Sequence, residues 1–192
     1  GGLRQFRVFL DTIRPDVVHV HHFLNFGLEA FFVIRDVVPD ARVILTLHDY
    51  YSICPSNGQL FKHEDATRCE GPSLLKCRKC FPKRDPIAFK LRALAVKDAM
   101  SLCDGVVSPS HFLKRLVEPH LKLSRPIEVV ENGYMGEHHT ISPRQERAGP
   151  MRFGYFGNIS EVKGLRSLLE AVEVLSEEGI SGFHLDVHGQ QL

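Results

Sequence analysis

Residues 151–171 read MRFGYFGNISEVKGLRSLLEA, which is a short apolar strand, a glycine turn and an amphipathic helix in succession. Gly157 lets the backbone pass close to a ligand, and Asn158 is a residue type that turns a chain or caps a helix. The helix begins near Lys163 and Gly164, where first-turn amides carry positive partial charge and suit a phosphate. The stretch therefore predicts an α/β fold with an anion site, although any strand-to-helix turn of such a fold has similar residues.

The same alternation of apolar strands and amphipathic helices runs through the rest of the chain. Residues 16–22 and 42–47 are β-branched and almost continuously apolar, as strands covered on both faces are. We expect strands at residues 16–22, 42–47, 105–108, 126–130, 152–156 and 183–187, and helices at residues 3–13, 23–38, 86–103, 111–117 and 163–178. This succession indicates an α/β fold class with Rossmann-like parallel sheets.

The chain divides at residues 136–150, which are polar, contain two prolines and lack periodicity, as linkers do. We expect a partial N-terminal domain over residues 1–135 and the start of a C-terminal domain over residues 151–192. One βαβ segment leaves its sheet edge and helix face without partners, so the C-terminal domain is expected to be incomplete in this sequence.

Charge and hydropathy restrict the classes of function. The 192 residues carry a net charge of +1 at pH 7, so the overall field attracts neither nucleic acid nor an acidic partner. The apolar runs are far shorter than the roughly 20 residues that cross a bilayer, and the N-terminus has no signal-peptide pattern. The sequence indicates a cytoplasmic protein without a nucleic-acid partner.

Polar residues follow several expected strands at their carboxyl ends, where open parallel sheets bind ligands. The candidates are His22, His48, Asp49, Ser110, Asn132 and Gly133. Structural roles compete with binding roles, because Ser110 is a good helix N-cap and Asn132–Gly133 suits a tight turn. Strand alternation puts His19 and His21 on one face and His22 on the other, which excludes a compact metal triad. We interpret His19 and His21 as structural.

Four of the five cysteines lie in residues 52–82, a Pro-, Gly- and Cys-rich insertion in which Asn57–Gly58 signals a hairpin. They are Cys54, Cys69, Cys77 and Cys80. The Cys-x-x-Cys step lets two thiolates meet one zinc ion and a hairpin could bring the other two over, so we predict a structural zinc site. Disulfides and free thiols are the alternatives, and His63 is a substitute ligand. Cys103 is interpreted as a small buried hydrophobe.

Six stretches together resemble the family-4 retaining glycosyltransferases of the GT-B fold. They are DVVHVHH (16–22), ILTLHDYYSICP (44–55), GVVSPSHFLKRLV (105–117), IEVVENGYM (127–135), FGYFGNISEVKGLRSLLEAVEVL (153–175) and HLDVHGQ (184–190). The resemblance implies two Rossmann-like domains facing across a cleft. It also implies a nucleotide-diphosphate sugar donor, a glycan or lipid-linked acceptor, a role in surface polysaccharide synthesis, and catalysis that requires no cofactor.

The resemblance also implies roles for particular residues. Lys163 would hold the diphosphate together with backbone amides around Gly157 and Gly164, and His48 would reach the donor sugar near the reacting centre. Asp49 would orient His48 or cap the following turn. Asn158 stands where the family commonly has an arginine, and a neutral amide cannot replace a guanidinium on a diphosphate, so more of the charge would rest on Lys163.

The family's glycine-rich loop and its acidic donor-binding pair have no counterpart in these 192 residues, so we expect the fragment not to be a complete catalyst. Two other functions remain open. One is a GT-B sugar-nucleotide epimerase, and the other is a non-enzymatic interaction module stabilised by zinc.

Residues 76–97 hold a local excess of lysine and arginine. Such residues are usually solvated, but the family's lipid-linked acceptors suggest a peripheral contact with anionic lipid at the inner membrane face. The helix expected next to them has an apolar stripe typical of a face turned to a core, made of Ile87, Leu91, Leu94, Ala95, Ala99 and Leu102.

Overall fold

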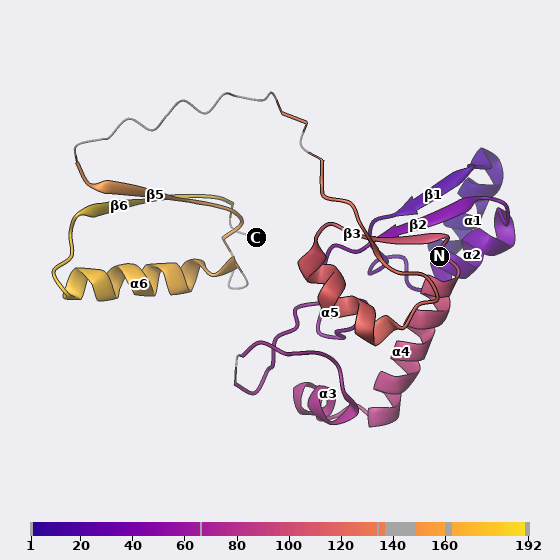
Figure 1. The fold of residues 1–192 in the computed structure, drawn as a ribbon, viewed down its shortest axis with the longest axis horizontal. Coiled ribbons are helices and arrows are strands. Elements are labelled where there is room, and N and C mark those ends of the chain that lie inside the picture. Colours follow the sequence, from indigo (N-terminus) through magenta and orange to yellow (C-terminus); the bar gives the residue numbers. More distant parts are fainter. Residues whose placement is uncertain (1, 66, 134, 137–148, 160–162, 191–192) are drawn as a thin grey trace. The chain divides into compact units, whose positions relative to one another are not determined.

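The computed structural model describes residues 2–65, 67–133, 135–136, 149–159 and 163–190. The chain forms two compact units, Gly1–Met135 and Gly136–Leu192, and each is described by itself (Figure 1). Residues 137–148 of the expected linker lie outside the described residues.

The first unit is built on a parallel sheet whose strands follow one another in chain order. The strands are β1 (Val17–Val20), β2 (Arg42–Thr46), β3 (Gly105–Ser108) and β4 (Glu128–Val129). All neighbouring strands pair in parallel, because each connection includes a helix that returns the chain to the end of the sheet at which the previous strand began. The predicted α/β class with a Rossmann-like parallel sheet is confirmed.

The helices of this unit are α1 (Gly2–Ile13), α2 (Glu29–Val37), α3 (Leu74–Cys80), α4 (Pro86–Ser101) and α5 (His111–Leu121). Side chains define three of their starts. Ser73 accepts a hydrogen bond from the amide of Lys76, Asp85 caps α4 ahead of a proline, and Ser110 caps α5. Helix α2 begins later than expected, because Gly27 adopts a φ of 78° and closes a separate turn on Phe23.

The core lies between the sheet and its helices. Many of its fully buried side chains come from α1, α2, β2, α4, α5 and the residue before β4, and include Leu10, Ile34, Val43, Leu45, Val96, Val117 and Ile127. Arg35 joins these elements at the amino-terminal edge of the sheet. It donates to Asp104 at 2.8 Å and to the carbonyl oxygens of Leu102 and Ala41, while Asp104 also accepts from the amide of Val43.

Helix α4 buries only part of the stripe that its sequence suggested. Phe89, Val96, Ala99 and Met100 pack inward, whereas Ile87, Leu91 and Leu94 are 62%, 59% and 48% exposed. The predicted stripe is therefore confirmed at Ala99 and at Leu102, which packs against the core, and is wrong over the first part of the helix. The helix carries apolar residues on two faces, and periodicity cannot tell which of them meets the sheet.

The insertion over residues 52–82 is mostly irregular, with α3 and one antiparallel bridge between Phe61 and Arg68 (Figure 1). The expected Asn57–Gly58 hairpin is wrong. Residues 50–54 form a turn of their own, in which the amide of Cys54 donates to the carbonyl oxygen of Tyr50. No strand therefore directly precedes Asn57 and Gly58. The chain reverses instead where the amide of Lys62 donates to the carbonyl oxygen of Thr67 at 2.8 Å.

The second unit contains β5 (Met151–Phe156), α6 (Leu165–Glu177) and β6 (Phe183–His188). The strands pair in parallel from Met151↔Phe183 to Phe156↔His188. Gly164, with a φ of 75°, is the residue at which α6 begins.

Candidate functional site

The carboxyl ends of β1 and β2 bring four histidines and one aspartate together. Nδ1 of His21 lies 3.1 Å from Nε2 of His48, Nε2 of His22 lies 2.8 Å from a carboxylate oxygen of Asp49, and Nε2 of His19 lies 2.8 Å from Oγ1 of Thr46. Each pair is separated by the same 27 residues in sequence. The register of β1 on β2 has an offset of 25 residues (Val17↔Arg42), so each contact joins a residue to the one two positions beyond the residue set opposite it. All three contacts therefore depend on the same register.

His21 links the other two histidines on its face. Its ring stacks on His48 at 5.3 Å between centroids and lies 4.1 Å from the ring of His19. Partial desolvation lowers the pKa of His19 below 6.5, and the neighbouring His21 and His48 lower it further. A proton on His19 is therefore disfavoured near neutral pH. The interpretation of His21 as merely structural missed its contact with His48.

Asp49 contacts His22. The other nitrogen of His22, Nδ1, accepts from the amide of Leu24 at 2.9 Å, which places the ring proton on Nε2, facing the carboxylate. The second oxygen of Asp49 accepts from the amide of Tyr51 at 2.7 Å. Asp49 was expected either to orient His48 or to cap the following turn. Its bond from the amide of Tyr51 corresponds to the cap, and the histidine that it contacts is His22.

The insertion and α4 support the turn that carries Asp49. Gly58 has a φ of 70°, and a Cβ there would lie 2.6 Å from the amide nitrogen of Tyr51 and 2.9 Å from the Asp49 carboxylate. Arg92 donates to the carbonyl oxygens of Tyr51 and Ser52, and its guanidinium lies 5.0 Å from the centroid of the Tyr51 ring. In the sequence, Arg92 is one of the basic residues of the segment 76–97, which were expected to be solvated. Its spacing from Phe89 and Val96, on the buried face of α4, is the signal that could have separated it from them.

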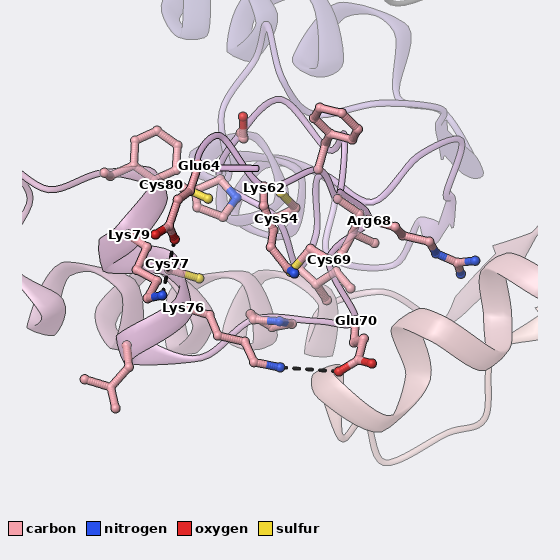
Figure 2. A pocket seen from close by; sticks show the side chains of 18 of the residues that line it. Cys54, Lys62, Glu64, Arg68, Cys69, Glu70, Lys76, Cys77, Lys79 and Cys80 are labelled. Atoms are coloured by element: carbon pink, nitrogen blue, oxygen red, sulfur yellow. Dashed lines mark hydrogen bonds and ion pairs between the residues drawn. The ribbon is translucent and has the colours of Figure 1, made fainter. Parts of the chain in front are cut away.

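The insertion also surrounds a pocket of about 340 Å³ (Figure 2). Its lining includes the four predicted zinc ligands, Cys54, Cys69, Cys77 and Cys80, all of them free thiols. Burial raises the pKa of the Cys77 thiol, and the nearby thiols of Cys54, Cys69 and Cys80 raise it further. Among the described residues, no group of three or more His, Cys, Asp or Glu side chains is arranged to hold a metal ion.

A comparison with protein families covers the first unit. The family model for Glycosyltransferase Family 4 matches residues 1–134, which include the histidine pairs and the whole insertion. The chain belongs to Glycosyltransferase Family 4. A search of curated proteins finds no match to the chain. Membership of the family makes the protein a transferase that acts on a sugar donor and an acceptor.

The remaining candidates in the first unit of this glycosyltransferase have local roles. Ser110 uses its hydroxyl oxygen to accept from the amide of Leu113 at 3.2 Å, and the buried Ser108 donates to the carbonyl oxygen of Ser110 at 2.8 Å. These bonds correspond to the N-cap alternative. Asn132 and Gly133 follow β4 and are exposed.

In the second unit, the expected donor-binding residues follow the carboxyl end of β5. Lys163 and Gly164 are exposed, and no heavy atom lies within 4 Å of a Cβ built on Gly164. Gly157 differs from expectation, because its amide donates to the carbonyl oxygen of His188 at 3.1 Å and so is not available to a phosphate. Asn158 is exposed, and its carbonyl oxygen accepts from the Tyr155 hydroxyl at 3.0 Å.

Cys103, the cysteine outside the insertion, packs against the core, and burial raises the pKa of its thiol to about 12. In the part of the glycosyltransferase that the structure describes, no helix is both long and apolar enough to cross a membrane.

Proposed function

We propose that this glycosyltransferase transfers a sugar, with retention of configuration, from a nucleotide-diphosphate donor to a glycan or lipid-linked acceptor in surface polysaccharide synthesis. The observation that carries the proposal is the exposed His48 at the carboxyl edge of the parallel sheet, hydrogen-bonded to His21. Ligands of open α/β sheets bind at this edge, and the family match covers it.

The chemistry of the transfer suits a neutral histidine. Breaking the bond between sugar and diphosphate creates an oxocarbenium-like centre, and negative charge accumulates on the leaving group. When Nδ1–H of His21 donates to Nε2 of His48, the ring proton of His48 is on its own Nδ1. His48 then offers a hydrogen bond to the donor sugar, and no cofactor is required for the step.

Lys163 is the residue proposed for the diphosphate in a GT-B arrangement. Its exposed position directly before α6 puts an ammonium beside first-turn amides, where an anion is favoured. With the amide of Gly157 bonded to His188, Lys163 and the backbone at Gly164 carry the proposal for the second unit.

The function is tested in the full-length enzyme with a panel of nucleotide sugars, by measuring nucleotide release with and without acceptor. The anomeric configuration of the product is read by NMR. Transfer with retention supports the proposal, whereas inversion, or isomerisation of the donor without transfer, contradicts it. Lys163→Ala should sharply reduce turnover, and Arg4→Ala, at an exposed basic residue of α1, is the control.

We also propose a peripheral contact between anionic lipid and residues 76–97. Lys76 and Lys79 pair with Glu70 and Glu64, and Arg92 contacts the fold, so these three are poor candidates for lipid binding. Lys83, Lys90 and Lys97 are exposed near the exposed apolar residues Ile87, Leu91 and Leu94. A helix face that combines apolar and basic side chains is typical of an interfacial contact.

A further inference from the structure

The insertion over residues 52–82 has very little core of its own. Among its described residues, the buried apolar side chains are Ile53, Leu60 and Cys77. Its regular structure is limited to the seven-residue α3 and the bridge at Phe61 and Arg68. Loop-rich segments that bury so few apolar groups usually depend on a cross-link, either a disulfide or a metal ion.

The fold of the insertion gathers four cysteines from three places. Cys54 lies at the end of the turn over residues 50–54. The amide of Cys69 donates to the carbonyl oxygen of Leu60 at 2.7 Å, which holds the chain at Cys69 beside the chain at Leu60. Cys77 and Cys80 are three residues apart on α3, which puts both thiols on one side of that helix. Figure 2 shows the four side chains around one pocket.

We propose that Cys54, Cys69, Cys77 and Cys80 together bind one structural zinc ion. Four thiolates satisfy the tetrahedral preference of Zn²⁺ and close its coordination sphere, as in structural sites. On binding, four zinc–sulfur bonds form and each thiol releases its proton to solvent, so the step needs no oxidant or reductant. The site adds a metal centre to the glycosyltransferase that is independent of the sugar-transfer chemistry.

The residues around the pocket offset part of the charge of such a site. A zinc ion with four thiolates carries a net charge of −2, and the lining has one more basic than acidic side chain, with Lys62, Arg68, Lys76 and Lys79 against Glu64, Asp65 and Glu70. Lys76 and Lys79 also bond to Glu70 and Glu64, at 3.5 and 3.2 Å, and so tie α3 to the preceding loop (Figure 2). These ion pairs hold the Cys77 and Cys80 side of the pocket next to the Cys69 side.

The thiols must turn to meet the ion, since no described group of three already stands in ligand geometry. A cysteine has one side-chain torsion, χ1, that moves its sulfur. Cys69 donates to the carbonyl oxygen of Gly71 at 3.3 Å, a weak bond that a zinc–sulfur bond would replace. His63 is a poorer fourth ligand, because its two ring nitrogens bond to Ser56 and to the carbonyl oxygen of Cys80.

The first experiment measures metal in the unmodified protein, purified under reducing conditions from zinc-containing medium. We expect one zinc per chain by elemental analysis, and release of that zinc after four thiols have reacted with an organomercurial. Replacement by Co²⁺ should give the intense visible bands of a tetrahedral thiolate complex. Absence of stoichiometric zinc after reconstitution with Zn²⁺ and reduced thiols would overturn the proposal, as would a native disulfide between any two of the four cysteines.

A pair of variants assigns the ligands. Cys77→Ser should lose the zinc and make the peptide bonds of residues 52–82 sensitive to protease, because the cross-link is gone. Cys103→Ala is the matched control, since Cys103 lies outside the lining of the pocket and should leave the zinc content unchanged. Retention of full zinc by Cys77→Ser would contradict the assignment. If that variant fails to fold, the metal content of the unmodified protein still decides the question.

Discussion

Nδ1 of His21 lies 3.1 Å from Nε2 of His48, and the two imidazole rings stack 24° from parallel. One of the two nitrogens must donate and the other accept. The bond therefore exists only while the accepting nitrogen carries no proton. It restrains the orientation of His48, and when His21 donates, the proton of a neutral His48 is on its own Nδ1. His21 is therefore a positioning residue for the histidine that we propose beside the donor sugar.

Substitution of the two histidines should separate contact from positioning. His48→Ala should lower kcat by roughly 10²–10³-fold, the size of effect seen when one donor to a developing charge is removed. His21→Ala should lower kcat less and shift the acid limb of the pH–rate profile, while His21→Asn should partly restore the rate. Steady-state kinetics of the full-length enzyme measure both effects.

His184→Gln is the control for these variants. His184 is exposed and pairs with Arg152 at the amino-terminal part of the β5–β6 ladder, away from the strand ends that precede Lys163. Its kinetics should match those of the unmodified enzyme. A pH profile of His21→Ala identical to that of the unmodified enzyme would remove the positioning role.

Acidification should destabilise the first unit through His19. The pKa of His19 is lowered in the folded state, so the unfolded chain binds this proton more readily. The contribution of His19 to stability is then fully present above pH 6.5, the ordinary value for the group, and is lost as the pH falls below it. Urea unfolding at pH 7.5 and 5.5 should show a smaller decrease for His19→Gln than for the unmodified protein, and equal decreases would rule this out.

The ion pair between Arg35 and Asp104 should matter for stability. Arg35 is 24% exposed and Asp104 is 40% exposed, and both also bond to backbone groups of neighbouring elements. Arg35→Met should lower the free energy of unfolding by about 1.5–3 kcal/mol, the range for bonds to charged groups, and partial solvation favours the lower end. Urea denaturation gives the value.

Arg7→Met provides a matched comparison, because Arg7 pairs with Asp36 at a site where the two side chains are 50% and 63% exposed. An exposed pair of this kind contributes about 0–1 kcal/mol. If both variants lose the same free energy, the backbone contacts of Arg35 contribute nothing beyond the ion pair.

Gly58 should be intolerant of a side chain. Its φ of 70° is unfavourable for alanine, and the new Cβ would overlap the amide of Tyr51 and the Asp49 carboxylate. Gly58→Ala should lower the free energy of unfolding by roughly 1–3 kcal/mol and displace Asp49 from His22, with a loss of activity. Gly182→Ala, which meets no atom within 4 Å, should be close to neutral. Comparable losses in the two variants would argue against a specific fit.

Membrane contact should depend on the exposed face of α4. Co-sedimentation with phosphatidylcholine vesicles should be weak, should increase when an anionic lipid is included, and should fall at high salt. Leu91→Ser should reduce the binding, whereas Phe9→Ser, an exposed residue of α1, should not. Binding that ignores both anionic lipid and salt would refute the proposed contact.

Local sequence was sufficient for the parts of this protein that depend on neighbouring residues. The apolar runs located β2 and β3 to within a residue or two, and the Ser110 cap followed from its side chain and the helix after it. Both are properties of a few consecutive residues, because strand propensity and capping act over one turn or less. The α/β class followed from the order of these elements.

Tertiary structure alone decided which face of α4 is buried, where the insertion reverses, and which side chains meet at the sheet edge. Arg92 contacts Tyr51 because α4 packs across the turn, and its spacing from Phe89 and Val96 shows only that it shares their face of the helix. His21 meets His48 across 27 residues because β1 and β2 pair in one particular register. A shift of one residue would turn each side chain to the other face, so the histidine contacts are a consequence of strand pairing, which the residues of β1 alone do not specify.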